Sequence, residues 1–89
     1  MAEAYPHMFT VYVLKSLKNA KRYIGYTAKS VEQRLKEHNS GLSTFTSRNG
    51  SFEIMYTEVY SVKKEAIQRE KFLKSGKGRE FLDRIHLGP

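Results

Sequence analysis

Apolar and polar residues follow a strand-like pattern in three segments of the chain. Residues 9–14 and 22–27 are rich in β-branched and aromatic side chains, which favour strands. Only a short polar connection, with Asn19 as its turn residue, separates them, and this spacing predicts a hairpin. Residues 52–60 alternate apolar and polar side chains from their start as far as Tyr56, which predicts a third strand.

Residues 30–38 predict a first helix. Ser30 is a favourable N-cap, and Gln33 three residues later completes a capping-box pattern. The Asn-Ser-Gly segment at 39–41 contains residues that tolerate the left-handed conformation in which helices often end. The polar residues of segment 40–51 then predict a loop.

Two further helices are expected near the C-terminus. Residues 62–73 repeat apolar side chains at helical spacing beginning with Val62, with Ser61 as the expected cap and Gly76 as the expected end. Residues 79–85 predict a short amphipathic helix. The side chains expected to face inward from this helix are those of Phe81, Leu82 and Ile85.

This pattern predicts an α+β domain with the element order β-β-α-β-α-α, in which a three-stranded antiparallel-type sheet is flanked by helices. The 89 residues leave room for one hydrophobic core. We expect residues 1–8, which include Pro6, to form a loose N-terminal segment, and residues 9–86 to form the single domain.

The chain is strongly basic, with 16 Lys and Arg against 9 Asp and Glu and a net charge of +7. Such a charge favours a polyanionic partner such as nucleic acid, although small domains can be basic without a specific partner. The absence of cysteine excludes disulfide bonds and thiolate metal sites. No apolar run approaches the roughly 18 residues of a membrane span, and the N-terminus lacks signal-peptide features. We therefore expect no membrane partner and a cytoplasmic location.

Ionisable residues interrupt the apolar stripes of the first two predicted helices. At 3.6 residues per turn, Arg34 and His38 fall within the same arc of roughly 80° as the apolar residues Val31 and Leu35. Glu70 lies inside an apolar arc of roughly 140° on the second helix. Burying an unpaired charge costs several kcal/mol, so a core helix normally excludes such residues. An arginine, a histidine and a glutamate together are typical of a site for a phosphate and a metal ion.

Each of these residues also has a purely structural interpretation. The stem of Arg34 can lie on the core while its guanidinium reaches solvent. His38 can simply close the first helix near its C-terminal end. Glu70 can pair with Lys74 one helical turn away. For each residue taken alone, both interpretations remain open.

The predicted hairpin carries one tyrosine on each strand, Tyr12 and Tyr23. Strand alternation places Tyr23 and Gly25 on one face and Ile24 and Tyr26 on the other. A glycine inside a strand often marks the close approach of a ligand or of another segment. A tyrosine in a strand is by itself typical of sheet packing.

The residues that together resemble the GIY-YIG nuclease family are, in chain order, Tyr12, the segment Tyr23-Ile24-Gly25, Arg34, His38 and Glu70. The resemblance extends over residues 9–85. Residues 34–39 and 69–76 are similar to those of the small stand-alone bacterial members, which are often labelled excision-nuclease-subunit-like. Two departures are present: only the tyrosine remains of the first half of the signature, and Tyr26 stands where some relatives have a lysine.

The resemblance implies a role for each of these residues. Tyr23 would orient the attacking water or act as its general base, and Tyr12 would hydrogen-bond in the same site. Arg34 would hold the scissile phosphate, while His38 would contact the phosphate or assist proton movement. Glu70 would be the sole protein ligand of one divalent metal ion, with magnesium (Mg) expected and manganese (Mn) as the alternative. Since tyrosine has a reference pKa of about 10, such a base predicts activity that rises toward alkaline pH.

The resemblance therefore implies a metal-dependent endonuclease that hydrolyses nucleic-acid phosphodiester bonds, with DNA as the expected substrate and repair or recombination as the expected process. The alternatives are a non-catalytic nucleic-acid-binding module and an interaction domain that acts with a repair partner. Other basic side chains, including that of Arg69, are expected in solvent. The basic residues expected to line the path of the nucleic acid are Lys29, Lys36, Arg48, Lys74 and Lys77.

Overall fold

The computed structural model describes residues 8–40 and 48–87, and the elements in these ranges follow the predicted order. They are β1 (Phe9–Ser16), β2 (Arg22–Thr27), α1 (Val31–Asn39), β3 (Phe52–Tyr60), α3 (Lys63–Lys74) and α4 (Gly76–Leu87). The predicted second and third strands are confirmed at both ends. Residues 1–7 of the expected loose start and residues 41–47 of the expected loop lie outside the described residues. No helix in the described ranges has the length and apolarity needed to cross a membrane.

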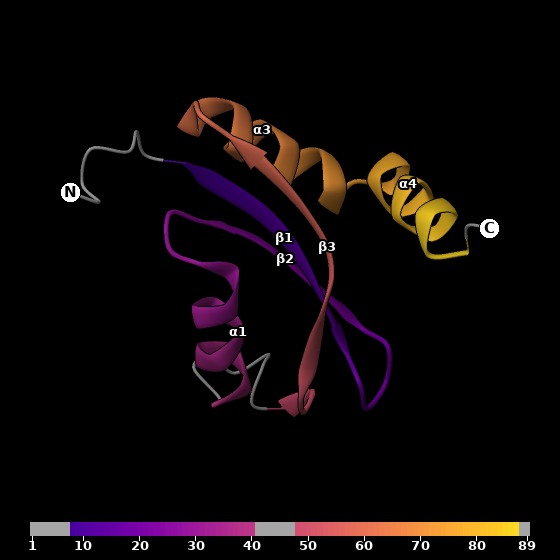
Figure 1. Cartoon of the computed structure of the whole chain (residues 1–89). Helices are drawn as coiled ribbons and strands as arrows, with labels where there is room; N and C mark the ends of the chain where they lie inside the picture. Colours follow the sequence, from indigo (N-terminus) through magenta and orange to yellow (C-terminus); the bar gives the residue numbers. More distant parts are fainter. Residues whose placement is uncertain (1–7, 41–47, 88–89) are drawn as a thin grey trace.

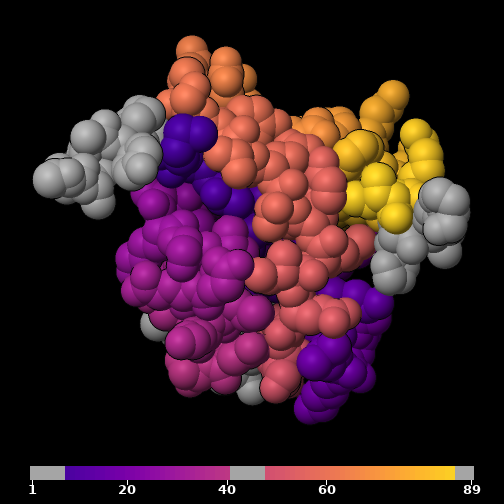
Figure 2. Space-filling view, viewed as in Figure 1, coloured from indigo at the N-terminus to yellow at the C-terminus, as the bar shows by residue number. Residues whose placement is uncertain are grey.

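The strands form one antiparallel sheet in the order β2-β1-β3, so β1 lies in its centre. Helix α1 packs on one face of the sheet, and α3, followed by α4, lies on the opposite face (Figure 1). The edge strand β3 forms a strip across the visible surface between α1 and the C-terminal helices (Figure 2). The predicted α+β arrangement is therefore confirmed.

Alternation along β1 builds a separate apolar cluster on each face of the sheet. The cluster on the α3 side contains Val11, Val13, Ala66, Leu73 and Leu82. The cluster on the α1 side contains Tyr12, Leu14, Val31 and Phe52. As predicted for β2, Tyr23 packs toward α1, whereas Ile24 and Tyr26 pack toward α3. The two tyrosines of the hairpin, Tyr12 and Tyr23, thus lie on the same face as α1.

A β-bulge in β3 corrects one expectation for that strand. Val13 pairs with Tyr56 and Leu14 pairs with Ile54, so Met55 is an extra residue in β3. As a result, Ile54 packs toward α1 and Tyr56 packs toward α3. Tyr56 therefore does not continue the alternation that its apolar spacing predicted.

Side-chain hydrogen bonds at both ends position α1 against the sheet. The Ser30 hydroxyl accepts a hydrogen bond of 3.1 Å from the Gln33 amide, as the capping-box pattern predicted. At the other end, Asn39 Oδ1 accepts a hydrogen bond of 2.7 Å from the amide of Phe52, which joins the helix to the start of β3. These contacts hold the last turn of α1, including the buried His38, against the sheet.

The ends of α3 differ from the prediction. Val62, rather than Ser61, is the N-cap, and it makes no side-chain capping bond. Val62 is 47% exposed and does not belong to the apolar arc in which it was expected. Gly76 does not end this helix, because Ser75 is the C-cap and Gly76 begins α4 three residues earlier than expected.

Helix α4 makes a tight contact with the end of α3 through Gly78, which is buried. A Cβ atom on Gly78 would lie 2.5 Å from Leu73 Cα and would also meet the carbonyl oxygen of Phe72. Of the residues predicted to face inward from α4, Leu82 is fully buried. Ile85 is 40% exposed, so that part of the prediction was wrong.

Arg69 joins α3 to β3 and is not the solvated surface residue that was expected. Its Nε and Nη2 atoms lie 2.8 and 2.9 Å from the two carboxylate oxygens of Glu58. The guanidinium carbon also lies 4.8 Å from the ring centroid of Phe72 and 5.0 Å from that of Phe81. This bidentate, partly buried pair links the long edge strand to the helix that carries Glu70.

Candidate active site

Tyr12 and His38 form the buried centre of the candidate site. Tyr12 belongs to the central strand β1, His38 belongs to the last turn of α1, and each is 1% exposed. The Tyr12 hydroxyl oxygen lies 3.1 Å from His38 Nε2. Gly25, opposite Tyr12 on β2, leaves the space that the tyrosine ring crosses. The close approach expected at this glycine is therefore made by another segment of the chain.

Arg34 connects this centre to charges at the surface. Its Nη2 atom lies 3.4 Å from His38 Nε2, and its Nη1 atom forms an ion pair with the carboxylate of Glu37. Lys29 Nζ lies 3.3 Å from the same carboxylate. The Arg34 side chain is only 21% exposed, so its guanidinium is held at the edge of the site and does not project freely into solvent.

Burial and the neighbouring Arg34 set the protonation states of the two central groups. Burial raises the pKa of the Tyr12 hydroxyl, and hydrogen bonding and charge from Arg34 oppose this rise. Burial, with a smaller effect of the Arg34 charge, lowers the pKa of His38. At neutral pH the phenol is therefore protonated and the imidazole is neutral. Because the Arg34 guanidinium that also faces Nε2 can only donate, we assign Nε2 as the acceptor of the Tyr12 hydroxyl. The imidazole proton then lies on Nδ1, which has no hydrogen-bond partner within the described part of the chain.

Tyr23 lies against both of these groups from the edge strand β2. Its ring centroid is 4.4 Å from that of His38 and 6.4 Å from that of Tyr12, and the two tyrosine rings are stacked. Tyr23 is half-buried and also lines a pocket. The structure thus brings together the four predicted residues that come from β1, β2 and α1.

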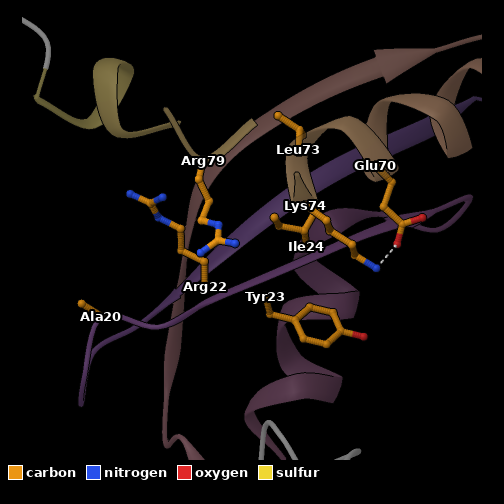
Figure 3. A pocket seen from close by; sticks show the side chains of 8 residues that line it. All are labelled: Ala20, Arg22, Tyr23, Ile24, Glu70, Leu73, Lys74 and Arg79. Atoms are coloured by element: carbon orange, nitrogen blue, oxygen red, sulfur yellow. Dashed lines mark ion pairs between the residues drawn. The ribbon is translucent and has the colours of Figure 1, made fainter. Parts of the chain in front are cut away.

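The pocket has a volume of about 670 Å³ and joins Tyr23 to Glu70 of α3 (Figure 3). The Glu70 side chain is 18% exposed, and its Oε2 atom forms an ion pair of 3.1 Å with Lys74 Nζ. The charge of Glu70 also contributes to the raised pKa of Tyr12, after burial and Tyr23. Glu70 therefore lies within electrostatic reach of the buried centre.

The family model described as the GIY-YIG catalytic domain matches residues 8–82. The chain belongs to the GIY-YIG family. A UPF0213 protein from Bacillus licheniformis is 38% identical over 73 residues, which are 81% of this chain and 71% of that protein. A UPF0213 protein from Staphylococcus saprophyticus is 32% identical over 79 residues, 88% of this chain and 94% of that protein. The solution NMR structure of a UPF0213 protein from Bacillus halodurans is also similar, with 33% sequence identity and a TM-score of 0.54. The match covers 92% of this chain and 88% of that protein's chain.

These comparisons confirm the resemblance on which the site residues were named. The GIY-YIG family is a nuclease family, and the relatives are small bacterial proteins that match this chain over most of its length. The likeness to a small stand-alone member of the family is therefore also supported.

The carboxylate that the family resemblance would assign to a divalent metal ion is that of Glu70, which is half-buried beside the pocket. In the two described ranges no three His, Asp or Glu side chains come together as a ready-made metal site. Magnesium keeps several waters and commonly takes only one or two carboxylates plus substrate oxygens, so this donor set fits it. A bound ion would take its remaining ligands from water and from the substrate.

The basic residues predicted along the substrate path are not all in one place. Lys74 lines the pocket beside Glu70. Lys29 is held by its ion pair with α1. Lys36, Arg48 and Lys77 are exposed and do not line this pocket.

Two charged residues near the GIY-YIG signature residues, Glu37 and Arg22, were not predicted, and Arg79 was expected only among the solvated basic residues. Glu37 pairs with Arg34, and the i,i+3 spacing of opposite charges on a helix was a signal that could have found it. Arg22 and Arg79 line the same pocket as Tyr23, and Arg22 also pairs with Asp83 of α4 at 2.7 Å. These two arginines come from different elements, and only the fold brings them to one pocket.

Proposed function

We propose that this protein is a metal-dependent endonuclease that hydrolyses phosphodiester bonds in DNA. The observation that carries the proposal is the pocket shared by Tyr23 and Glu70. It brings a tyrosine of β2 and a half-buried carboxylate of α3 to one opening. The Tyr23 ring packs against His38, which in turn lies beside Arg34, although neither of these two residues lines the pocket.

Each side chain has a function that its surroundings support. Tyr23 reaches the pocket and would orient or deprotonate the attacking water. Arg34 keeps its charge, and its planar guanidinium would hold a phosphate oxygen as negative charge develops on it. Tyr12, buried and protonated, would fix the position of His38 and would not act as the base. A divalent ion held by Glu70 would supply further positive charge at the phosphate.

Positive charge continues along the pocket, and this supports a nucleic-acid substrate. Lys74, Arg22 and Arg79 line the pocket together with the two signature residues (Figure 3). A phosphate backbone entering this opening would be attracted by these groups and by the net charge of +7. We propose repair or recombination as the process in which the cleavage is used.

Cleavage of labelled nicked, branched, single-stranded and duplex DNA, with magnesium or manganese, tests this proposal. Wild-type protein should give products that are lost when EDTA is added. Glu70→Ala and Arg34→Ala should abolish them. Glu65→Ala is the matched control, because Glu65 is an exposed residue of the same helix as Glu70, and it should cleave like wild type.

The two alternatives give different results in the same experiment. A non-catalytic module would bind DNA in a salt-sensitive manner without forming products from any substrate. An interaction domain would form no products and no salt-sensitive complex with DNA, and sedimentation with a protein partner would be needed to detect its complex.

A further inference from the structure

Glu70 and Lys74 form an ion pair inside the pocket. They lie one helical turn apart on α3, with Oε2 and Nζ 3.1 Å apart. Figure 3 shows this pair beside Tyr23. The Glu70 side chain is 18% exposed and the Lys74 side chain is 55% exposed, so the ammonium can leave the carboxylate without disturbing the core.

The position of this ion pair matters more than its effect on stability. Exposed i,i+4 pairs contribute little to a helix. The carboxylate involved is the one that the proposed function assigns to a divalent cation. An ammonium at 3.1 Å neutralises that carboxylate, and it would repel a second cation bound to the same group.

We infer that Lys74 is an exchangeable counterion of Glu70: it neutralises the carboxylate while no metal ion is bound, and it transfers to a phosphate of the nucleic acid when a divalent cation takes its place. This inference rests on the proposed function, since it requires Glu70 to bind the cation. The flexible stem and compact, three-donor ammonium of lysine suit a transfer between two anionic partners.

The exchange links the two binding events. Metal binding frees Lys74 for the nucleic acid, and the nucleic acid draws Lys74 away from the carboxylate. Each ligand therefore raises the affinity of the protein for the other, by the same factor. A phosphate that receives Lys74 would also lie near Arg79 and Arg22, which line the rest of the pocket.

Manganese binding in the absence of nucleic acid, measured by water-proton relaxation, tests the first half of this inference. Lys74→Met should bind manganese about threefold to tenfold more tightly than wild type, because a competing charge is removed. Lys71→Met removes the same charge from an exposed neighbouring position of α3 and should stay within about twofold of wild type. Glu70→Gln should weaken manganese binding.

The outcomes separate this inference from the proposed function. Equal manganese affinities for Lys74→Met and Lys71→Met, combined with weakened binding by Glu70→Gln, would overturn the exchange and leave the metal site supported. Wild-type manganese affinity for Glu70→Gln would overturn both the metal site and the exchange.

Nucleic-acid binding in EDTA tests the second half with a double-mutant cycle. In wild type, Lys74 is held by Glu70, so Lys74→Met should change the affinity for labelled DNA by less than about twofold. In the Glu70→Gln background the lysine is free, and the same substitution should lower the affinity at least about threefold. Equal effects of Lys74→Met in the two backgrounds would overturn the transfer to phosphate.

Discussion

A Cβ atom on Gly25 would lie 2.8 Å from the hydroxyl oxygen of Tyr12, the residue opposite it on β1. The Tyr12 ring therefore lies over Gly25 of β2 and occupies the space that a side chain at position 25 would need. This placement brings the hydroxyl to His38 Nε2. Gly25 is not among the residues with positive φ, so packing, and not backbone conformation, requires glycine at this position.

Gly25→Ala should therefore damage the site as well as the fold. The added methyl group would push Tyr12 away from His38, and we expect a loss of about 1–3 kcal/mol in the free energy of unfolding. DNA cleavage should fall at least about tenfold, because the groups that position Tyr23 are displaced. Urea unfolding and cleavage rates measure the two effects. Cleavage at the wild-type rate would show that the position of Tyr12 is not required.

Gly78→Ala should destabilise the fold more strongly than Gly25→Ala. Its Cβ would meet the backbone of α3 at Leu73 and Phe72, which cannot move aside as a flexible side chain can. We expect a loss of about 3 kcal/mol or more in the free energy of unfolding, measured with urea. Gly76→Ala is the matched control, because a Cβ there has no atom within 4 Å. Similar urea midpoints for the two variants would contradict the tight contact.

The strands and α1 could be predicted because their signals are local. Alternation and β-branched residues identify the strands, and Ser30 with Gln33 marks the start of α1. The corner between α3 and α4 could not be predicted in this way. Ser75, Gly76 and Gly78 resemble a turn between helices, and only the contact of Gly78 with Leu73 shows that one helix follows the other without a loop.

The candidate site, too, could be predicted where the signals are local in the sequence and not where they depend on tertiary contacts. The signature residues could be named because their order along the chain matches a family, and the structure brings the tyrosines, His38 and Arg34 together. Helical spacing could also indicate the partners of Arg34 and Glu70, but the places of the other arginines depend on tertiary contacts between separate elements. Arg22 and Arg79 reach one pocket only after folding. Arg69 is withdrawn from solvent by Glu58 of β3 and by the ring of Phe81 of α4, which are distant from it along the chain.

Glu58 should make stability depend on pH in the acid range. Burial alone would raise the pKa of this carboxyl, but hydrogen bonds from Arg69, Tyr56 and Tyr60 outweigh burial and lower the pKa. A carboxyl with a lowered pKa in the folded state contributes stability above its unfolded pKa of about 4.3, and this stability is lost as the pH falls through the folded pKa. Glu58→Gln should therefore lose about 1–3 kcal/mol of unfolding free energy near neutral pH.

Urea unfolding of wild type and Glu58→Gln between about pH 7 and pH 3 checks this prediction. The two stabilities should converge as the solution becomes more acidic. Glu65→Gln, in which an exposed carboxyl of α3 is replaced, serves as the control and should follow wild type throughout. A constant difference between wild type and Glu58→Gln across this range would contradict the lowered pKa.

His38 should cause a separate loss of stability at milder acidity. Burial lowers its pKa in the folded state, so the fold favours the neutral imidazole. The stability is fully present above the unfolded pKa of about 6.5, and it is lost as the pH falls from there through the folded pKa, by at most about 1.4 kcal/mol per pH unit. His38→Gln keeps a hydrogen-bonding group for Tyr12 but cannot be protonated, so its unfolding free energy should stay level in this range.

Urea midpoints at small pH steps between about 8 and 5, above the range in which Glu58 acts, measure the difference. Parallel pH curves for the two proteins would show that protonation of His38 costs nothing in the folded state.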